Sequence, residues 1–115
     1  MTPIAFAAFA LGLPAATVTV QWGGSQVYKV GGKMFAVLGG AVGGGGFALK
    51  ASAVAFAVLS ESGAARPAPY LARAGWLRIE DLAGLEAEEV SGWLANAHAL
   101  VAARLTRALR AELGL

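Results

Sequence analysis

Apolar and polar positions alternate with a period of two along much of the first half of the chain, a spacing typical of half-buried strands. Residues 17–22 show it most clearly, because β-branched threonines and valines take turns there. Similar short runs of apolar and β-branched residues recur between glycine turns. The pattern predicts five strands: residues 17–22, 26–30, 33–38, 47–50 and 76–80.

Other segments carry helix signals. Thr2 followed by Pro3 predicts a helix start, since a hydroxyl caps free amides and proline is tolerated at the first helical position, and residues 12–14 end this helix. Ser52 is the predicted cap of a second helix, residues 53–60. The first 60 residues therefore contain two short helices.

A long last helix is predicted to begin near Glu86. Acidic residues gather at its start and arginines at its end, as the helix macrodipole favours, so both charge runs are interpreted as structural and solvated. Its apolar stripe consists of Val90, Trp93, Leu94, Ala97, Val101, Leu105 and Leu109. Its charged runs are Glu86, Glu88 and Glu89, and Arg104, Arg107 and Arg110.

Glycines mark the turns between strands. Residues 23–24 form one turn, and residues 31–32 give a two-residue hairpin signal. The glycine-rich segment 39–46 lies between two strands and is predicted to be a flexible hairpin loop. A phosphate-cradling loop would need a Gly-Lys-Ser/Thr ending or a helix opening directly on the last glycine, and neither is present.

The predicted order is helix, four strands, helix, strand, helix. This order predicts an α+β fold of two layers, an antiparallel sheet of about five strands with helices packed on one face. The other face is free to stay open to solvent. Strict alternation would put Lys33, Phe35 and Val37 on one face and Met34, Ala36 and Leu38 on the other, without showing which is covered. At 115 residues, a single domain over residues 1–115 is expected.

Composition narrows the classes of function. The chain has no cysteine, which excludes disulfides, thiolate metal sites and cysteine nucleophiles, and favours a cytoplasmic location. The apolar block at residues 4–13 is far shorter than the ~20 residues that a membrane span requires. No lysine or arginine precedes it to form a signal peptide. We expect no membrane association.

Charge is distributed unevenly along the chain. Through residue 79 there are six basic side chains against one acidic, a net charge of +5, whereas the remainder has three basic against six acidic, or −3. An anion-binding surface is therefore expected in the first two thirds.

Enzymatic chemistry finds little support. His98 is the single histidine, Asp81 the single aspartate, and Ser91 lies almost two helical turns from His98, so no catalytic set is evident. One histidine without a ligand cluster does not build a metal site. We expect a packing or surface role for His98, and no catalytic residues, cofactor or metal.

Basic residues on the predicted sheet are the candidate site. Lysines on strands either protect edges from aggregation or form a platform for nucleic-acid phosphates. Aromatic rings beside them, Tyr28, Tyr70 or Trp76, are candidates for base stacking. The candidate phosphate-binding residues are Lys29, Lys33, Lys50, Arg66, Arg73 and Arg78.

A set of ordered fragments resembles the MmcQ/YjbR family of small bacterial proteins. The fragments are Gly32-Lys33-Met34-Phe35-Ala36, Leu49-Lys50, Pro67-Ala68-Pro69-Tyr70 and Trp76. The resemblance runs from residue 13 to the last helix. It implies a frataxin-like or secretion-chaperone-like fold, and DNA binding by wing-like hairpins at residues 23–24, 31–32 and 39–46. The two prolines of the Pro-x-Pro-Tyr turn themselves predict a rigid crossing, where Tyr70 packs its ring.

The chain departs from this family pattern at several positions. Its middle loop is extended with glycine and carries no lysine or arginine, and Gly75 stands where histidine is frequent. Ala97-His98 replaces a usual Ser-Tyr pair. Histidine keeps the aromatic body and polar tip of tyrosine, which favours a structural role for His98.

Two functions remain open from the sequence. The first is a non-enzymatic protein that contacts the backbone of double-stranded DNA with weak sequence specificity, since no base-reading helix is evident. The second is a protein-interaction or chaperone-like module that uses an apolar sheet or helix face, with Trp22, Phe35 and Trp93 as anchors. A monomer is favoured in either case.

Overall fold

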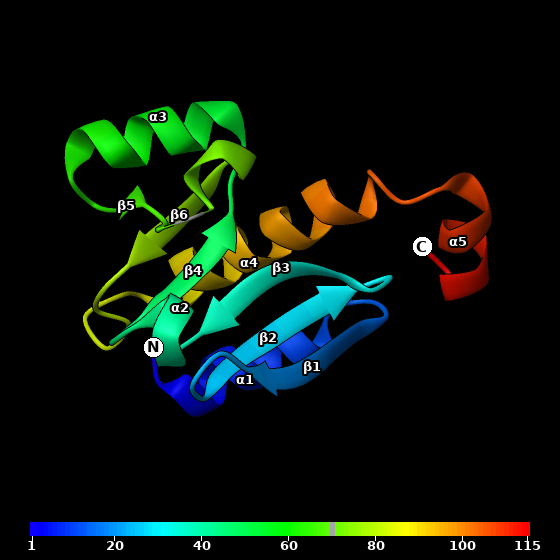
Figure 1. Ribbon diagram of the computed structural model, residues 1–115, viewed down its shortest axis with the longest axis horizontal. Helices are drawn as coiled ribbons and strands as arrows, with labels where there is room; N and C mark the ends of the chain where they lie inside the picture. The colour runs from blue at the N-terminus through cyan, green and yellow to red at the C-terminus, as the bar shows by residue number, and fades with distance from the viewer. Residues whose placement is uncertain (70) are drawn as a thin grey trace.

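The computed structural model describes residues 1–69 and 71–115, and these residues form an α+β fold around one six-stranded antiparallel sheet (Figure 1). Tyr70, and with it the packing and stacking predicted for its ring, lies outside the described residues. The strand order is β1-β2-β3-β4-β6-β5. The strands are β1 (Ala16–Gln21), β2 (Ser25–Val30), β3 (Lys33–Leu38), β4 (Phe47–Lys50), β5 (Arg66–Pro67) and β6 (Trp76–Ile79).

The helices begin and end largely where capping residues predicted. Thr2 accepts a hydrogen bond from the Ala5 amide at the start of the first helix, and Ser52 accepts one from the Ala55 amide at the start of the third. Gly63 ends that helix in the left-handed conformation. The helices are α1 (Pro3–Gly12), α2 (Gly40–Gly43), α3 (Ala53–Ser62), α4 (Ala87–Ala102) and α5 (Arg107–Leu113), with a 3₁₀ turn η1 (Ala72–Ala74).

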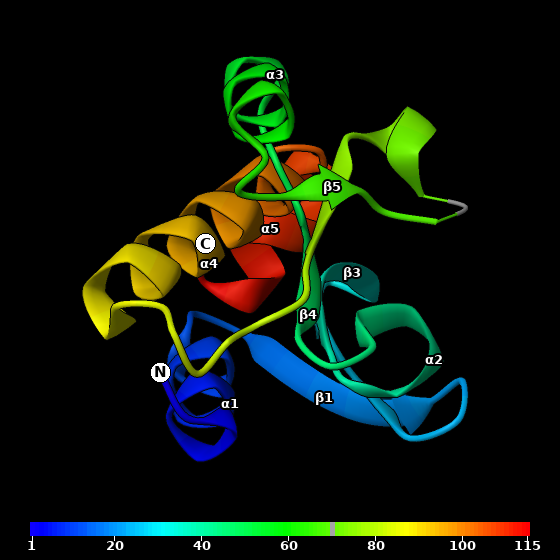
Figure 2. The ribbon, with the colours of Figure 1, turned by 90° about the vertical axis from the view of Figure 1, so that its left-hand side faces the viewer.

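Helices α1 and α4 pack on one face of the sheet and enclose the main core, as Figure 2 shows. Its fully buried rings, Phe6, Tyr28, Phe35 and Phe47, contact one another. The expected two-layer arrangement is confirmed. No helix formed by the described residues is long and apolar enough to span a membrane.

The opposite face is covered in part rather than left open. A second, smaller apolar cluster lies there, and α2 and the segment leading into β6 cover it (Figure 2). Its buried members are Val27, Val37, Ala48, Ala68 and Trp76. The predicted option of an open face is therefore wrong for the middle of the sheet.

Strict alternation along β3 is also wrong. The pairing of β2 with β3 shifts by one residue between Tyr28–Ala36 and Lys29–Met34, which leaves Phe35 as the extra residue of a β-bulge. Phe35 and Ala36 consequently both contribute to the main core, while Val37 turns to the smaller cluster. The bulge cannot be recognised from a two-residue period.

The glycine-rich segment 39–46 connects β3 to β4 as predicted, but it forms a defined turn that contains α2. The Gly39 amide donates to the Gly46 carbonyl at 3.0 Å and closes the turn. The buried Ser25 hydroxyl donates to the Gly39 carbonyl at 2.8 Å, and the Ala41 amide donates to the Trp22 carbonyl at 3.0 Å. These bonds fasten the turn to the hairpin between β1 and β2.

The long last helix of the sequence prediction is two helices. α4 ends at Ala102, and a new helix, α5, starts after Thr106, whose hydroxyl accepts a hydrogen bond from the Leu109 amide. Leu105 is buried between them, against Gly31 of the β2–β3 hairpin. A continuous apolar stripe thus concealed a chain reversal.

Candidate anion-binding site

The fold separates the six predicted basic residues into three places. Lys33, Lys50 and Arg73 come together at one end of the sheet, where the structure adds Arg104. Arg66 and Arg78 pair with Glu80. Lys29 lies apart on β2, opposite Thr17 and Met34. The sequence therefore identified three of the four residues of a cluster, and three residues outside it.

The cluster, which we call the cationic groove, comprises Lys33, Lys50, Arg73 and Arg104. Since β3 and β4 are antiparallel neighbours, the start of β3 lies beside the end of β4, which brings Lys33 and Lys50 together. Lys50 pairs with Trp76 at the start of β6, and η1, which carries Arg73, comes immediately before that strand. Arg73 therefore lies at the same end of the sheet as Lys50. Register alone thus assembles three of the four cations.

Arg104 comes from the connection between α4 and α5. Its neighbour Leu105 is buried against Gly31, and this contact holds the connection at the end of the β2–β3 hairpin. Arg104 was interpreted from the sequence as part of a solvated charge run. The signal that identifies it is tertiary, because more than 50 residues separate it from Lys50.

Two adjoining hollows make up the groove. One, of about 320 Å³, is lined by Lys33, Lys50 and Arg104, and the other, of about 500 Å³, by Lys50, Arg73 and Arg104. They share Lys50, Ala74 and Arg104. No aspartate or glutamate is among the residues that line them in the described part of the chain.

Lys50 shows the electrostatic consequence. Burial lowers the pKa of its ammonium below the ordinary value, and the Arg104 guanidinium lowers that pKa further. The ammonium donates a hydrogen bond to the Ala74 carbonyl. A Cβ atom at Gly75 would lie 3.2 Å from Lys50 Nζ, so glycine at this position leaves room for the ammonium.

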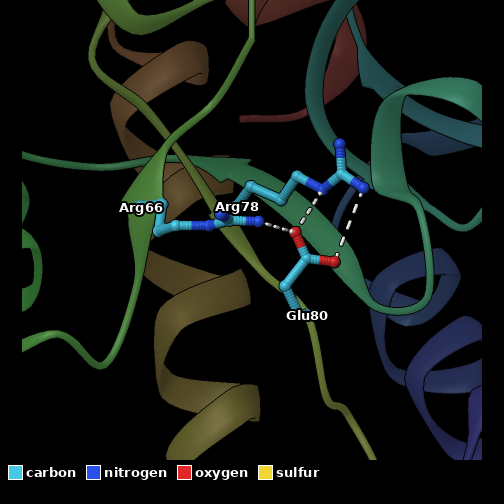
Figure 3. A network of polar contacts seen from close by, with 3 residues as sticks. All are labelled: Arg66, Arg78 and Glu80. Atoms are coloured by element: carbon cyan, nitrogen blue, oxygen red, sulfur yellow. Dashed lines mark hydrogen bonds and ion pairs between the residues drawn. The ribbon is translucent and has the colours of Figure 1, made fainter.

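Arg66 and Arg78 face Glu80 instead, as Figure 3 shows. Arg66 Nη2 lies 2.5 Å and Arg78 Nε 3.0 Å from Glu80 Oε1. The hydrogen bond from Arg66, with help from the charge of Arg78, lowers the pKa of the Glu80 carboxyl. Glu80 therefore balances one of the two positive charges of these arginines.

The aromatic residues differ from the prediction too. Tyr28 and Trp76 are buried in the two apolar clusters and offer no face for stacking. Phe56 of α3 is only partly buried and lines the larger hollow of the groove. Trp76 lines the smaller hollow but is almost fully buried, so Phe56 is the more exposed of the two rings beside the cations.

His98 has the predicted packing role. It is buried, its Nε2 lies 2.7 Å from the Pro14 carbonyl oxygen, and its ring packs edge-on against Phe35 at 5.3 Å between centroids. It thus ties α4 to the connection between α1 and β1. Among the described residues, no three histidine, aspartate or glutamate side chains come together as a metal site would require.

The proposed protein-binding anchors are only partly available. Phe35 is fully buried, and Trp93 is partly buried near Phe47. Trp22 is about half exposed. It lines an apolar hollow of about 380 Å³ together with Met34, Ala41, Val42, Pro69 and Leu71.

Fold and site together define a small α+β domain whose antiparallel sheet carries helices on one face and a cationic groove at one end. A family model described as YjbR matches residues 11–100, which is most of the chain. The chain belongs to the YjbR family. A comparison with curated proteins found none that matches it.

Proposed function

We propose that this protein is a non-enzymatic nucleic-acid-binding protein of the bacterial cytoplasm that holds the phosphate backbone in the cationic groove. The convergence of Lys33, Lys50, Arg73 and Arg104 without a lining carboxylate carries the proposal. The absence of cysteine from the sequence supports the location.

Unbalanced positive charge is the physical reason to expect a phosphate in the groove. Cations held close together without a counterion repel one another. Burial lowers the pKa of Lys50, and repulsion from Arg104 lowers it further. A phosphate placed between them would remove the repulsion and add charge-assisted hydrogen bonds. We assign one of two consecutive phosphates of one strand to each of the two adjoining hollows, which share Lys50 and Arg104.

Sequence specificity is expected to be weak. Side chains that contact only phosphates position a protein on nucleic acid without reading bases. Double-stranded DNA is the leading ligand. Phe56 adjoins the groove, so a base of single-stranded DNA could stack on its ring. The experiment therefore compares single-stranded with duplex DNA.

The test is a titration of duplex and single-stranded DNA at several salt concentrations. Two phosphate contacts should give a slope of log K against log salt of about −1.8 for duplex DNA, from ~0.9 per contact. Replacing both Lys33→Glu and Lys50→Glu should abolish binding. Flat salt dependence contradicts the proposal.

A matched control separates the groove from net charge. Arg107→Glu with Arg110→Glu makes the same change of four charge units on α5, outside the two hollows. This variant should retain a slope near that of the wild type. Equal losses in both double variants would show that overall charge, and no particular groove, attracts the DNA.

A protein-interaction function is the second candidate. The half-exposed Trp22 over an apolar hollow supports it, since exposed aromatics dominate interface energetics. Trp22→Ala should then weaken partner binding and leave DNA binding unchanged. A chain that binds no DNA at low salt would favour this second candidate.

A further inference from the structure

The two edges of the sheet are built differently. The edge strand β5 is two residues long and consists of an arginine and a proline, Arg66-Pro67. Charge, proline and short length are the devices that prevent an edge from pairing with another chain. The β5 edge is therefore protected.

The opposite edge strand, β1, lacks all three devices. It is six residues long, has no charged residue or proline, and within the described residues its one strand neighbour is β2 (Figure 1). Every residue of β1 after Ala16 is exposed. Its outer row of amides and carbonyls is a template for another strand.

The two faces of β1 also carry different side chains. Val18 and Val20 are 39% and 71% exposed and lie on the side of Tyr28 and Gln26 in the pairing with β2, while Thr17 and Thr19 lie on the other side. One side of the edge is thus apolar and the other carries hydroxyl groups. Helix α1 flanks the same strand.

Charge favours a second copy of this chain as the partner. The first 28 residues contain no charged side chain, so two copies meeting at β1 bring no like charges together there. An antiparallel pair related by a two-fold axis is also self-complementary, because each surface is its own partner.

We propose that β1 pairs antiparallel with β1 of a second copy and forms a symmetric dimer with one continuous sheet. With Thr19 at the two-fold axis, Val18 lies opposite Val20 of the second copy, and the valines of both copies share one face. The sheet then has twelve strands, six from each copy. This differs from the monomer expected from the sequence and is independent of DNA binding.

The experiment measures mass by sedimentation equilibrium from about 10 µM to about 1 mM protein. The wild type should approach twice the 11.6 kDa of one chain. Replacing Val18→Lys and Val20→Lys places like charges directly opposite each other, and the mass should return to 11.6 kDa. A variant with Val18→Glu and Val20→Glu should behave likewise.

Mixing the lysine and glutamate variants should restore the dimer, because each lysine then faces a glutamate. The matched control replaces Val54→Lys and Val58→Lys on α3, where the valines are 75% and 57% exposed, and should remain dimeric. Circular dichroism checks that every variant is folded, and Lys33→Glu with Lys50→Glu should leave the mass unchanged.

Four outcomes overturn the proposal. They are a wild-type mass of 11.6 kDa at every concentration, a dimer that survives the Val18→Lys and Val20→Lys changes, equal dissociation in the α3 control, and a lysine–glutamate mixture that stays monomeric.

Discussion

Burial and the neighbouring charge of Arg104 both lower the pKa of the Lys50 ammonium. Its pKa is lower in the folded chain than the ordinary 10.5, so the charged form opposes folding. Between the lowered pKa and 10.5 the unfolded chain binds more protons. The contribution of Lys50 to the free energy of unfolding therefore rises with pH across that window, and below it the destabilisation is present in full.

Arg104→Gln should raise the pKa of Lys50 towards its ordinary value, because it removes the guanidinium that lowers it. The pKa is measured from the ¹³Cε chemical shift of Lys50 during a pH titration. Arg107→Gln, on α5 and outside the groove, is the control and should leave this pKa where it is in the wild type. A pKa unchanged by Arg104→Gln would show that burial alone lowers it.

Individual residues of the candidate site were predictable only in part. Lys33 and Lys50 could be selected because both lie on neighbouring predicted strands. Nothing local distinguished Arg73 from Arg66, yet one lines the groove and the other pairs with Glu80. Arg104 was missed because its position depends on the burial of Leu105 against a hairpin far away in sequence.

Among the elements, the turn at residues 39–46 differs most from its sequence prediction. Gly39 and Gly40 both have positive φ, +66° and +65°. A Cβ atom at Gly40 would collide with the backbone of Ser25, whereas a Cβ atom at Gly39 would meet nothing within 4 Å. Glycine is thus needed for conformation at both positions and for space at one.

Gly39→Ala should lower the free energy of unfolding by about 2 kcal/mol, because φ +66° with ψ −165° is a backbone conformation nearly confined to glycine. Gly40→Ala adds a clash with backbone and should cost about 3 kcal/mol in total. Urea denaturation followed by circular dichroism measures both. Equal, small losses would mean that the turn is as loose as a glycine-rich linker.

Elements with local signals were predictable, and elements set by tertiary contacts were not. Caps at Thr2 and Ser52 and the two-residue period of β1 and β2 carry their own evidence. The two residues of β5 form a strand only because β6 pairs with them. The apolar stripe through Leu105 suggested one continuous helix. It is in fact two helices, α4 and α5, whose apolar residues pack against the same core and keep a helical spacing in the sequence.

For the whole molecule, an anion that binds the folded chain alone should stabilise it. Pyrophosphate, which carries two linked phosphates, is the probe for the paired hollows. At about five times its dissociation constant it should add about 1 kcal/mol, which raises the Tm of a domain of this size by about 4 °C. Differential scanning fluorimetry at constant ionic strength measures the shift.

The same titration on the variant with Lys33→Glu and Lys50→Glu should show no shift in Tm, since the groove then has no net positive charge. Sodium chloride at matched ionic strength is the control for general screening. A rise of the same size in the variant would assign the stabilisation to the molecule's net charge rather than to the groove.

The bulge at Phe35 also affects how this chain is compared with its relatives. Removing that one residue would make Tyr28–Ala36 and Lys29–Met34 consecutive pairs, and every other residue of β3 would keep its present face. A family member one residue shorter here therefore aligns correctly only with a gap placed at Phe35. Such a relative must fill the space of the missing ring from another element, since Tyr28 and His98 both pack against it.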